Sequence, residues 1–152
     1  MPDKRNRLFD PDGNRYPVKL SQQGLNDPLL SSIPATVLVF QLHGQTVELN
    51  ERIILLGSGA GSQCRNQIVK VGPKAYGLQC HFEMTPALFS SWLDLDNDLR
   101  NMNHDCLESE FAEISERHLS IGLTLFRNLL RLAELICDPL LNTETKPFSE
   151  LI

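Results

Sequence analysis

The stretch that decides the fold is residues 75–83, which read Ala-Tyr-Gly-Leu-Gln-Cys-His-Phe-Glu. It begins as a short apolar strand and ends with His81 and Glu83 two residues apart. Side chains two apart in an extended strand point to the same face. The Glu83 carboxylate can therefore accept the Nδ1–H of His81, which leaves Nε2 to take a proton from a nucleophile. The spacing predicts a histidine base oriented by a carboxylate, as in a catalytic triad.

This stretch resembles a signature of class I glutamine amidotransferases, Tyr-Gly-hydrophobic-Gln-Phe-His-Pro-Glu. The matching residues are Tyr76, Gly77, Leu78, Gln79, His81 and Glu83. Residues 39–44, Val-Phe-Gln-Leu-His-Gly, are similar to the family's Phe-Gln-Trp-His-Gly segment, and residues 64–67, Cys-Arg-Asn-Gln, to its Cys-X-Asn-Gln turn. The resemblance runs from about Arg15 to Trp92. It points to stand-alone proteins similar to the amidotransferase domain of GMP synthase.

The resemblance implies an α/β fold with a flavodoxin-like open mixed sheet. The chain would hold its C-terminal half, in residues 15–93, followed by a long amphipathic helix. It also implies hydrolysis of the glutamine side-chain amide by a Cys-His-Glu triad, with His81 and Glu83 as catalytic residues. His43 would shape the site that binds glutamine or a glutamyl-like molecule, without a cofactor or a metal. Without the resemblance, the simpler interpretation of His81 and Glu83 is a polar pair at a strand end, and that of His43 is a structural histidine.

The family's nucleophile, a cysteine in a Gly-X-Cys-X-Gly elbow, has no counterpart in this sequence. Cys80 is adjacent to His81, so it points to the opposite face of a strand. Cys64, Cys106 and Cys137 have no glycine-flanked sharp turn around them. We therefore expect the chain to be inactive alone, with its nucleophile in a missing N-terminal half or its chemistry shared with a synthetase partner. The alternative is a non-catalytic binding or scaffold protein derived from the same fold.

Two further departures from the signature surround His81. Cys80 stands in place of phenylalanine, and Phe82 in place of proline. Proline fixes its own φ and pushes the preceding residue toward extended geometry, so phenylalanine releases both restraints. The sequence therefore predicts a His81–Glu83 pair held less firmly than in the family.

The amino-acid composition indicates which classes of protein are compatible with this sequence. The 152 residues have ordinary apolar and charged contents of 41% and 22%, enough for one domain with a core. A formal charge of −5 argues against nonspecific binding to nucleic acid. Residues 1–13 do not resemble a signal peptide, and the apolar runs are too short to span a membrane. The four cysteines form no CxxC pair, which argues against a structural zinc site and favours a cytoplasmic protein with free thiols.

The remaining pattern predicts the order of the elements. We expect a polar segment at 1–14, strands near 16–20, 35–42, 52–56, 66–71 and 76–80, and a hairpin turn at 72–74. Residues 57–62, Gly-Ser-Gly-Ala-Gly-Ser, are a connection and not a phosphate loop, because a strand and not a helix follows them. Thr85 and Pro86 predict the start of a short helix.

The C-terminal part is predicted to be an acidic loop and helical extension over 94–137, then a flexible tail over 138–152. The amphipathic helix is expected from about Glu108 to Cys137, with His104 and His118 on its surface or at an interface. The family sheet is centred on strands that this chain does not encode. The chain is therefore expected to fold poorly alone, with apolar side chains lacking a covering layer: Val37, Val39, Ile54 and Leu56.

Overall fold

The structure, a computed structural model, describes residues 17–135 except 42, 44, 60–64 and 98. The elements in chain order are β1 (Pro17–Leu20), α1 (Gln22–Leu25), the 3-10 turn η1 (Pro28–Leu30), β2 (Thr36–Leu38), β3 (Ile53–Gly59), β4 (Asn66–Val71), β5 (Ala75–Leu78), α2 (Pro86–Leu95) and α3 (His104–Leu132). The polar segment predicted at 1–14, the tail predicted at 138–152, Cys64 and Cys137 lie outside the described residues.

The described strands form one five-stranded sheet in the order β2-β1-β3-β4-β5, and each neighbouring pair is antiparallel. The predicted hairpin is present between β4 and β5, where Val71 lies opposite Ala75 and Gly72 takes a positive φ of 61°. A glycine adopts this left-handed conformation without steric cost. The predicted α/β class with a C-terminal helix is confirmed, and all of its described strand pairings are antiparallel.

The sheet curls, so that the chain beyond one edge meets the chain beyond the other. β2 and β5 are the two edge strands. Past their ends, Phe40 and His81 form an isolated antiparallel bridge, in which the His81 N–H donates to the Phe40 carbonyl at 3.0 Å. The residue predicted to be the base therefore lies where the two ends of the curl come together.

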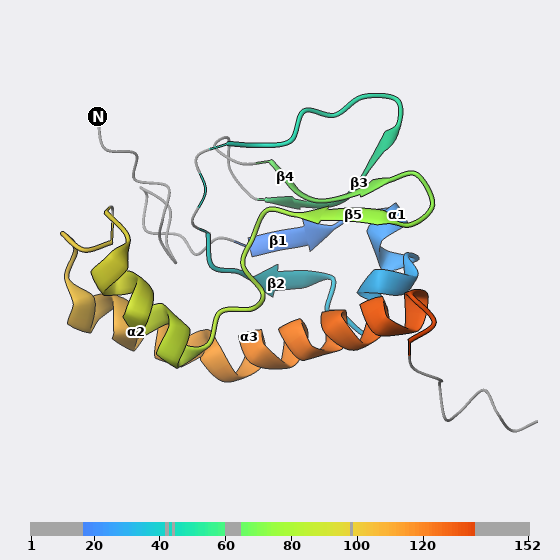
Figure 1. Ribbon diagram of the computed structural model, residues 1–152. Coiled ribbons are helices and arrows are strands. Elements are labelled where there is room, and N and C mark those ends of the chain that lie inside the picture. The colour runs from blue at the N-terminus through green and yellow to red at the C-terminus, as the bar shows by residue number, and fades with distance from the viewer. Residues whose placement is uncertain (1–16, 42, 44, 60–64, 98, 136–152) are drawn as a thin grey trace, which may run out of the picture.

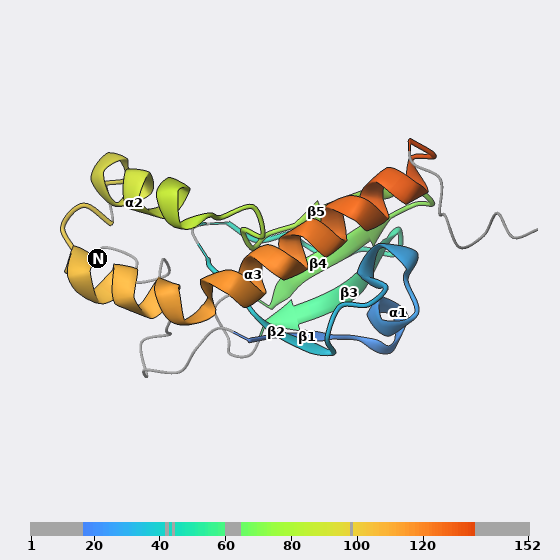
Figure 2. The same ribbon diagram turned by 90° about the horizontal axis from the view of Figure 1, so that it is seen from below.

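Helix α3 crosses one face of the sheet, and α2 packs against its N-terminal part (Figures 1 and 2). Helix α3 begins at His104, and the Oδ1 of its N-cap residue Asn103 accepts a hydrogen bond from the N–H of Cys106 at 3.0 Å. The helix therefore starts earlier than the predicted Glu108. The acidic stretch that ends at Glu116 was predicted to be a solvated face and a loop, and the loop is wrong for residues 104–107, which are helical. The acidic side chains of residues 104–116 lie on the exposed side of the helix, while Leu107, Phe111 and Ile114 are buried.

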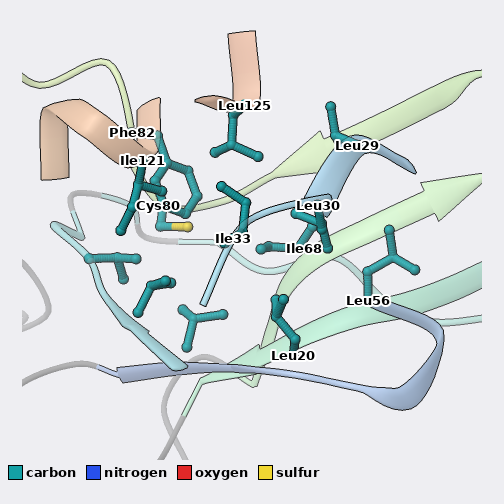
Figure 3. Close-up of a cluster of buried hydrophobic side chains, with 13 residues drawn as sticks. Leu20, Leu29, Leu30, Ile33, Leu56, Ile68, Cys80, Phe82, Ile121 and Leu125 are labelled. Atoms are coloured by element: carbon teal, nitrogen blue, oxygen red, sulfur yellow. The ribbon is translucent and has the colours of Figure 1, made fainter. Parts of the chain in front are cut away.

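Two hydrophobic clusters hold the helices to the sheet. One lies between the sheet and α3. Figure 3 shows it, with these members labelled: Leu20, Leu29, Leu30, Ile33, Leu56, Ile68, Cys80, Phe82, Ile121 and Leu125. The other joins α2 to the first half of α3: Phe40, Met84, Phe89, Leu93, Leu99, Leu107, Phe111 and Ile114. Val39 belongs to the first cluster and Phe40 to the second, so the apolar run around β2 is covered on both faces.

The prediction of uncovered apolar side chains was wrong for most of its residues. Val37, Val39 and Leu56 are each only 1% exposed. They belong to the same cluster as side chains of α3 and of the η1 region, which supply the covering layer. Ile54 remains 46% exposed, since it lies on β3 outside both clusters.

Candidate functional site

The structure brings His81 and Glu83 into direct contact. Nδ1 of His81 lies 2.7 Å from Oε1 of Glu83, the hydrogen bond that their spacing predicts. Glu83 is acceptor-only when ionised, so Nδ1 carries the ring proton and Nε2 of the neutral ring is the basic nitrogen. The His81 side chain is 24% exposed and that of Glu83 is 61% exposed. A histidine in this state can accept a proton from a group that approaches Nε2.

The backbone of His81 is held from two sides. Its N–H donates to the Phe40 carbonyl at 3.0 Å, and its carbonyl accepts a hydrogen bond from Nε2 of His118 at 2.7 Å. The Trp92 indole and the His81 ring meet in a T-shaped arrangement, with centroids 5.2 Å apart. These contacts come from the chain after β2, from α3 and from α2. The position of His81 is therefore set by three separate elements.

The surroundings of the Glu83 carboxyl favour its ionised form. Partial burial favours the neutral acid, but the hydrogen bond from His81 and one from the backbone outweigh it and lower the pKa of Glu83 below 4.5. Glu83 is therefore a carboxylate at neutral pH. It can accept the Nδ1 proton of His81 and stabilise the imidazolium that forms when Nε2 gains a second proton.

A cavity of about 700 Å³ lies beside this pair, between β5 and α3. Its polar lining includes His81, Glu83, Thr85 and, at the hairpin turn, Lys74. Most of its wall is apolar: Leu29, Leu78, Leu119, Leu123, Leu125, Phe126 and Leu129. Leu78, Leu123, Phe126 and Leu129 are at least 42% exposed, so the apolar wall is open to solvent. The cavity thus offers a polar end at the pair and a long apolar side.

His43 belongs to a different set of contacts. Its Nε2 lies 2.6 Å from Oε1 of Gln41, which also accepts a hydrogen bond from Nε2 of the buried Gln67 at 3.1 Å. Its Nδ1 lies 2.8 Å from the carbonyl of Gln45. Among the described residues that line the cavity, His43 does not occur. Its connection to the pair runs along the chain, through Gln41 to Phe40, whose carbonyl holds the His81 backbone.

The two cysteines that the structure describes differ in their surroundings. Cys80 is 4% exposed and lies in the cluster between the sheet and α3. Cys106 is exposed in the first turn of α3, where its Sγ contacts Oε1 of Glu110 at 3.4 Å. That carboxylate raises the pKa of the Cys106 thiol above 9.0. A raised pKa disfavours the thiolate, which is the nucleophilic form.

His118 is the site residue that sequence reasoning missed. It was predicted on the helix surface or at an interface, but it is 1% exposed and bonded to His81. Burial lowers its pKa below 6.5, against the opposing effect of the carbonyls of His81 and Leu38. The available signal was its position in the apolar stripe of α3, seven residues after Phe111 and seven before Leu125, both buried.

The described residues also bear on a metal site, a membrane span and a phosphate loop. Within them, no group of three or more His, Cys, Asp or Glu side chains is placed to hold a metal ion. In the same part of the chain, no helix combines the length and the apolar character needed to cross a membrane. Gly57 to Gly59 form the end of β3, and the next described element is the strand β4, whereas a phosphate loop leads into a helix. Residues 60–64 lie outside the described part of the chain.

Comparison with known proteins extends these observations. No family model matches the sequence. A glutamine amidotransferase-like protein of Salmonella typhimurium, YfeJ, is 34% identical over 70 residues, which are 46% of this chain and 28% of YfeJ. The crystal structure of SMU.1228c is 28% identical, with a TM-score of 0.62, and covers 85% of this chain. A Thermotoga maritima glutamine amidotransferase is 24% identical, with a TM-score of 0.62, and covers 86% of it.

In sequence the chain is thus similar to a glutamine amidotransferase-like protein, and in fold to a solved glutamine amidotransferase. It spans only 53% of each of those two solved structures, and its match spans just over a quarter of YfeJ.

Proposed function

We propose that this chain supplies the histidine and glutamate of a glutamine amidotransferase site, and that the nucleophile comes from another polypeptide segment. The observation that carries the proposal is the 2.7 Å hydrogen bond from His81 Nδ1 to Glu83, in a pair that borders an open cavity. His81 is the general base and acid, and Glu83 orients its ring. The substrate is glutamine or a glutamyl-like molecule.

The chemistry follows from the state of the pair. His81 Nε2 takes the proton of a cysteine thiol, and the thiolate attacks the side-chain amide carbon of glutamine. The imidazolium then protonates the departing nitrogen, so that ammonia leaves and a glutamyl thioester remains. Water, deprotonated by the same nitrogen, hydrolyses the thioester to glutamate and restores the thiol. Glu83 stabilises the imidazolium in each half of the cycle.

The described cysteines support a nucleophile from elsewhere. Cys80 is packed in the core, and the thiol of Cys106 is held in its neutral form by Glu110. The solved structures that this fold matches are about twice as long as the matched part, so a second half of the fold is the natural source. His43 shapes the substrate side of the site through Gln41. A cytoplasmic setting and a role like that of the amidotransferase domain of GMP synthase belong to the same proposal.

The test combines this chain with the part of the Thermotoga maritima amidotransferase that it does not match, as separate proteins and as a fusion. Ammonia release from glutamine is measured for the chain alone, for the mixture and for the fusion. We expect no release by the chain alone and measurable release by the fusion, lost in His81→Ala. His104→Ala, a histidine of α3 that does not line the cavity, serves as the matched control and should keep the activity.

Three results would overturn the proposal. Release by the chain alone that His81→Ala abolishes would place the nucleophile within this chain. A folded fusion that releases no ammonia, or one whose activity survives His81→Ala, would remove the catalytic role of the pair.

The second candidate, a non-catalytic binding protein, is favoured by the apolar wall of the cavity. Leu123, Phe126 and Leu129 of α3 line it and are exposed by 55%, 57% and 45%. An exposed apolar surface of this kind is typical of a binding site for an apolar ligand or polypeptide. In the same experiment, this function predicts that the second half binds but that ammonia is not released.

A further inference from the structure

We propose that His118 is a positioning residue, which holds His81 in place through the hydrogen bond from its Nε2–H to the His81 carbonyl. The assignment rests on the proposed role of His81 as the base. His118 does not line the cavity, so it acts through the backbone of His81 and not on the substrate.

The hydrogen bond has one possible direction. A carbonyl oxygen only accepts, so Nε2 of His118 carries the proton that lies between the two groups, 2.7 Å apart. The two residues are 37 positions apart in the chain, which makes this a tertiary contact between α3 and the segment after β5. Since Phe40 binds the N–H of the same residue, both polar groups of the His81 backbone have partners. The peptide plane on each side of His81 is thereby fixed.

Two rings hold the imidazole of His118 in the orientation that this bond requires. Phe82 stacks on it, with centroids 6.0 Å apart and an angle of 16° between the planes. Phe111, seven residues earlier in α3, meets the His118 ring in a T-shaped arrangement, with centroids 5.9 Å apart and an angle of 70° between the planes. Aromatic pairs prefer these two arrangements. Because Phe82 lies between His81 and Glu83 in the chain, its packing on His118 also fixes the backbone that separates the two members of the pair.

A second contact brings α3 onto the same segment. At Gly122, one helical turn after His118, an added Cβ would lie 2.3 Å from the carbonyl oxygen of Phe82. No side chain fits there, so the helix backbone approaches the 81–82 segment directly. The helix therefore touches this segment at two successive turns, through a hydrogen bond at His118 and through close packing at Gly122.

The charge state of His118 agrees with a positioning role. Burial lowers its pKa, so the ring is neutral at physiological pH. Glu83 and His81 are the titratable groups that act on it, in opposite directions. A neutral ring with its proton on Nε2 is a fixed hydrogen-bond donor, which is what the His81 carbonyl needs.

The experiment follows the Nδ1–H proton of His81 by NMR in protein with ¹⁵N-labelled histidine. Hydrogen-bonded to Glu83, this proton should give a slowly exchanging downfield resonance, assigned by its loss in His81→Ala. His118→Leu keeps an apolar side chain but removes the donor, and should lose the resonance. His118→Gln keeps an amide N–H donor, and should retain it. His104→Leu is the matched control on the same helix.

A merely structural histidine predicts a different pattern, in which both variants of His118 lower the melting temperature and neither changes the resonance. A folded His118→Leu protein that retains the resonance would overturn the assignment. If His118→Leu fails to fold, Gly122→Ala provides a second test, because it displaces the next turn of α3 from the 81–82 segment. The assignment is overturned if this variant does not weaken the resonance. The readout needs no catalysis, so failure of the ammonia assay and failure of this contact are separate results.

Discussion

The backbone N–H of His81 donates to the carbonyl of Phe40, and this one bond joins the chain beyond the two opposite edges of the sheet. The position of His81 therefore depends on the register of every strand between β2 and β5. His81, the base in the proposed function, is thereby fixed relative to the whole domain. This is the rigidity that proton transfer over a hydrogen-bond distance requires.

The first prediction concerns the pKa of Glu83. Burial raises this pKa, but hydrogen bonds from His81 and the backbone lower it further, to a value below 4.5. His81→Ala removes the contribution of the imidazole and leaves part of the burial, so the pKa should rise. A ¹³C NMR titration of the carboxyl carbon measures both values. An unchanged midpoint in His81→Ala would show that the hydrogen bond does not tune the carboxyl.

The lowered pKa of Glu83 also determines the direction in which stability changes with pH. The pKa of Glu83 is lower in the folded state, so its contribution is present above the unfolded value near 4.5 and is lost as pH falls through the folded value. His81→Ala should therefore melt with a weaker dependence on pH in this acid range.

The second prediction concerns His118. Its folded pKa lies below the unfolded value of 6.5, so the unfolded state binds more protons between the two values. The protein should lose stability as pH falls below 6.5, and the loss should level off below the folded pKa. Denaturant unfolding at several pH values measures the slope. His118→Gln should flatten it, whereas Ser120→Ala, which removes no titratable group from α3, should leave it unchanged.

The third prediction concerns Gly122. Its α-hydrogen faces the carbonyl of Phe82, and a Cβ there would clash at 2.3 Å with backbone that cannot rotate away. Alanine is the better helix former, but overpacking of this kind should outweigh that gain and destabilise the protein by about 2 kcal/mol. Ser120→Ala, an exposed position two residues earlier in α3, is the control and should be neutral. Equal stabilities of the two variants would contradict the close approach.

The fourth prediction concerns an ion pair that ties η1 to β4. Nζ of Lys70 lies 2.7 Å from Oδ2 of Asp27, whose Oδ1 caps η1 by accepting from the N–H of Leu29. Lys70→Met leaves a buried carboxylate without its cation and should cost about 2 kcal/mol at neutral pH. Lys19→Met, an exposed lysine of β1, is the control.

The pH dependence of this pair has the opposite sign to that of Glu83. The hydrogen bond to Asp27 raises the pKa of Lys70 above 10.5, so the stabilisation is present below 10.5 and is lost as pH rises through the folded pKa. The difference in unfolding free energy between the wild type and Lys70→Met should therefore shrink in strongly alkaline buffer. A constant difference across this range would show that packing, not the charge, accounts for the effect.

The sequence predicted what depends on local chemistry. The two-residue spacing predicted the contact between His81 and Glu83. Thr85 and Pro86 predicted the start of α2, and the turn residues after Val71 predicted the hairpin. It did not predict what depends on distant segments meeting. The covering of Val37 and Leu56 arises because α3 lies on the sheet, and no pattern within β2 or β3 shows that contact. The apolar stripe of α3 indicates which side of the helix His118 occupies, but its partner, the His81 carbonyl, depends on how the helix packs.

The last prediction concerns Phe82, where the related signature has proline. From sequence alone, Phe82→Pro should tighten the His81–Glu83 pair by restoring backbone restraint. The structure adds a cost, since the Phe82 ring is 6% exposed, belongs to the core under α3 and stacks on His118.

Removing most of that ring should destabilise the protein by about 3 kcal/mol and release His118 from its orientation. We therefore expect Phe82→Pro to lower the melting temperature and to weaken the Nδ1–H resonance of His81. Phe82→Leu, which keeps apolar volume without fixing φ, should show a smaller loss of both. A Phe82→Pro protein that is as stable as the wild type and has a sharper His81 resonance would show that backbone restraint outweighs the packing of the ring on His118.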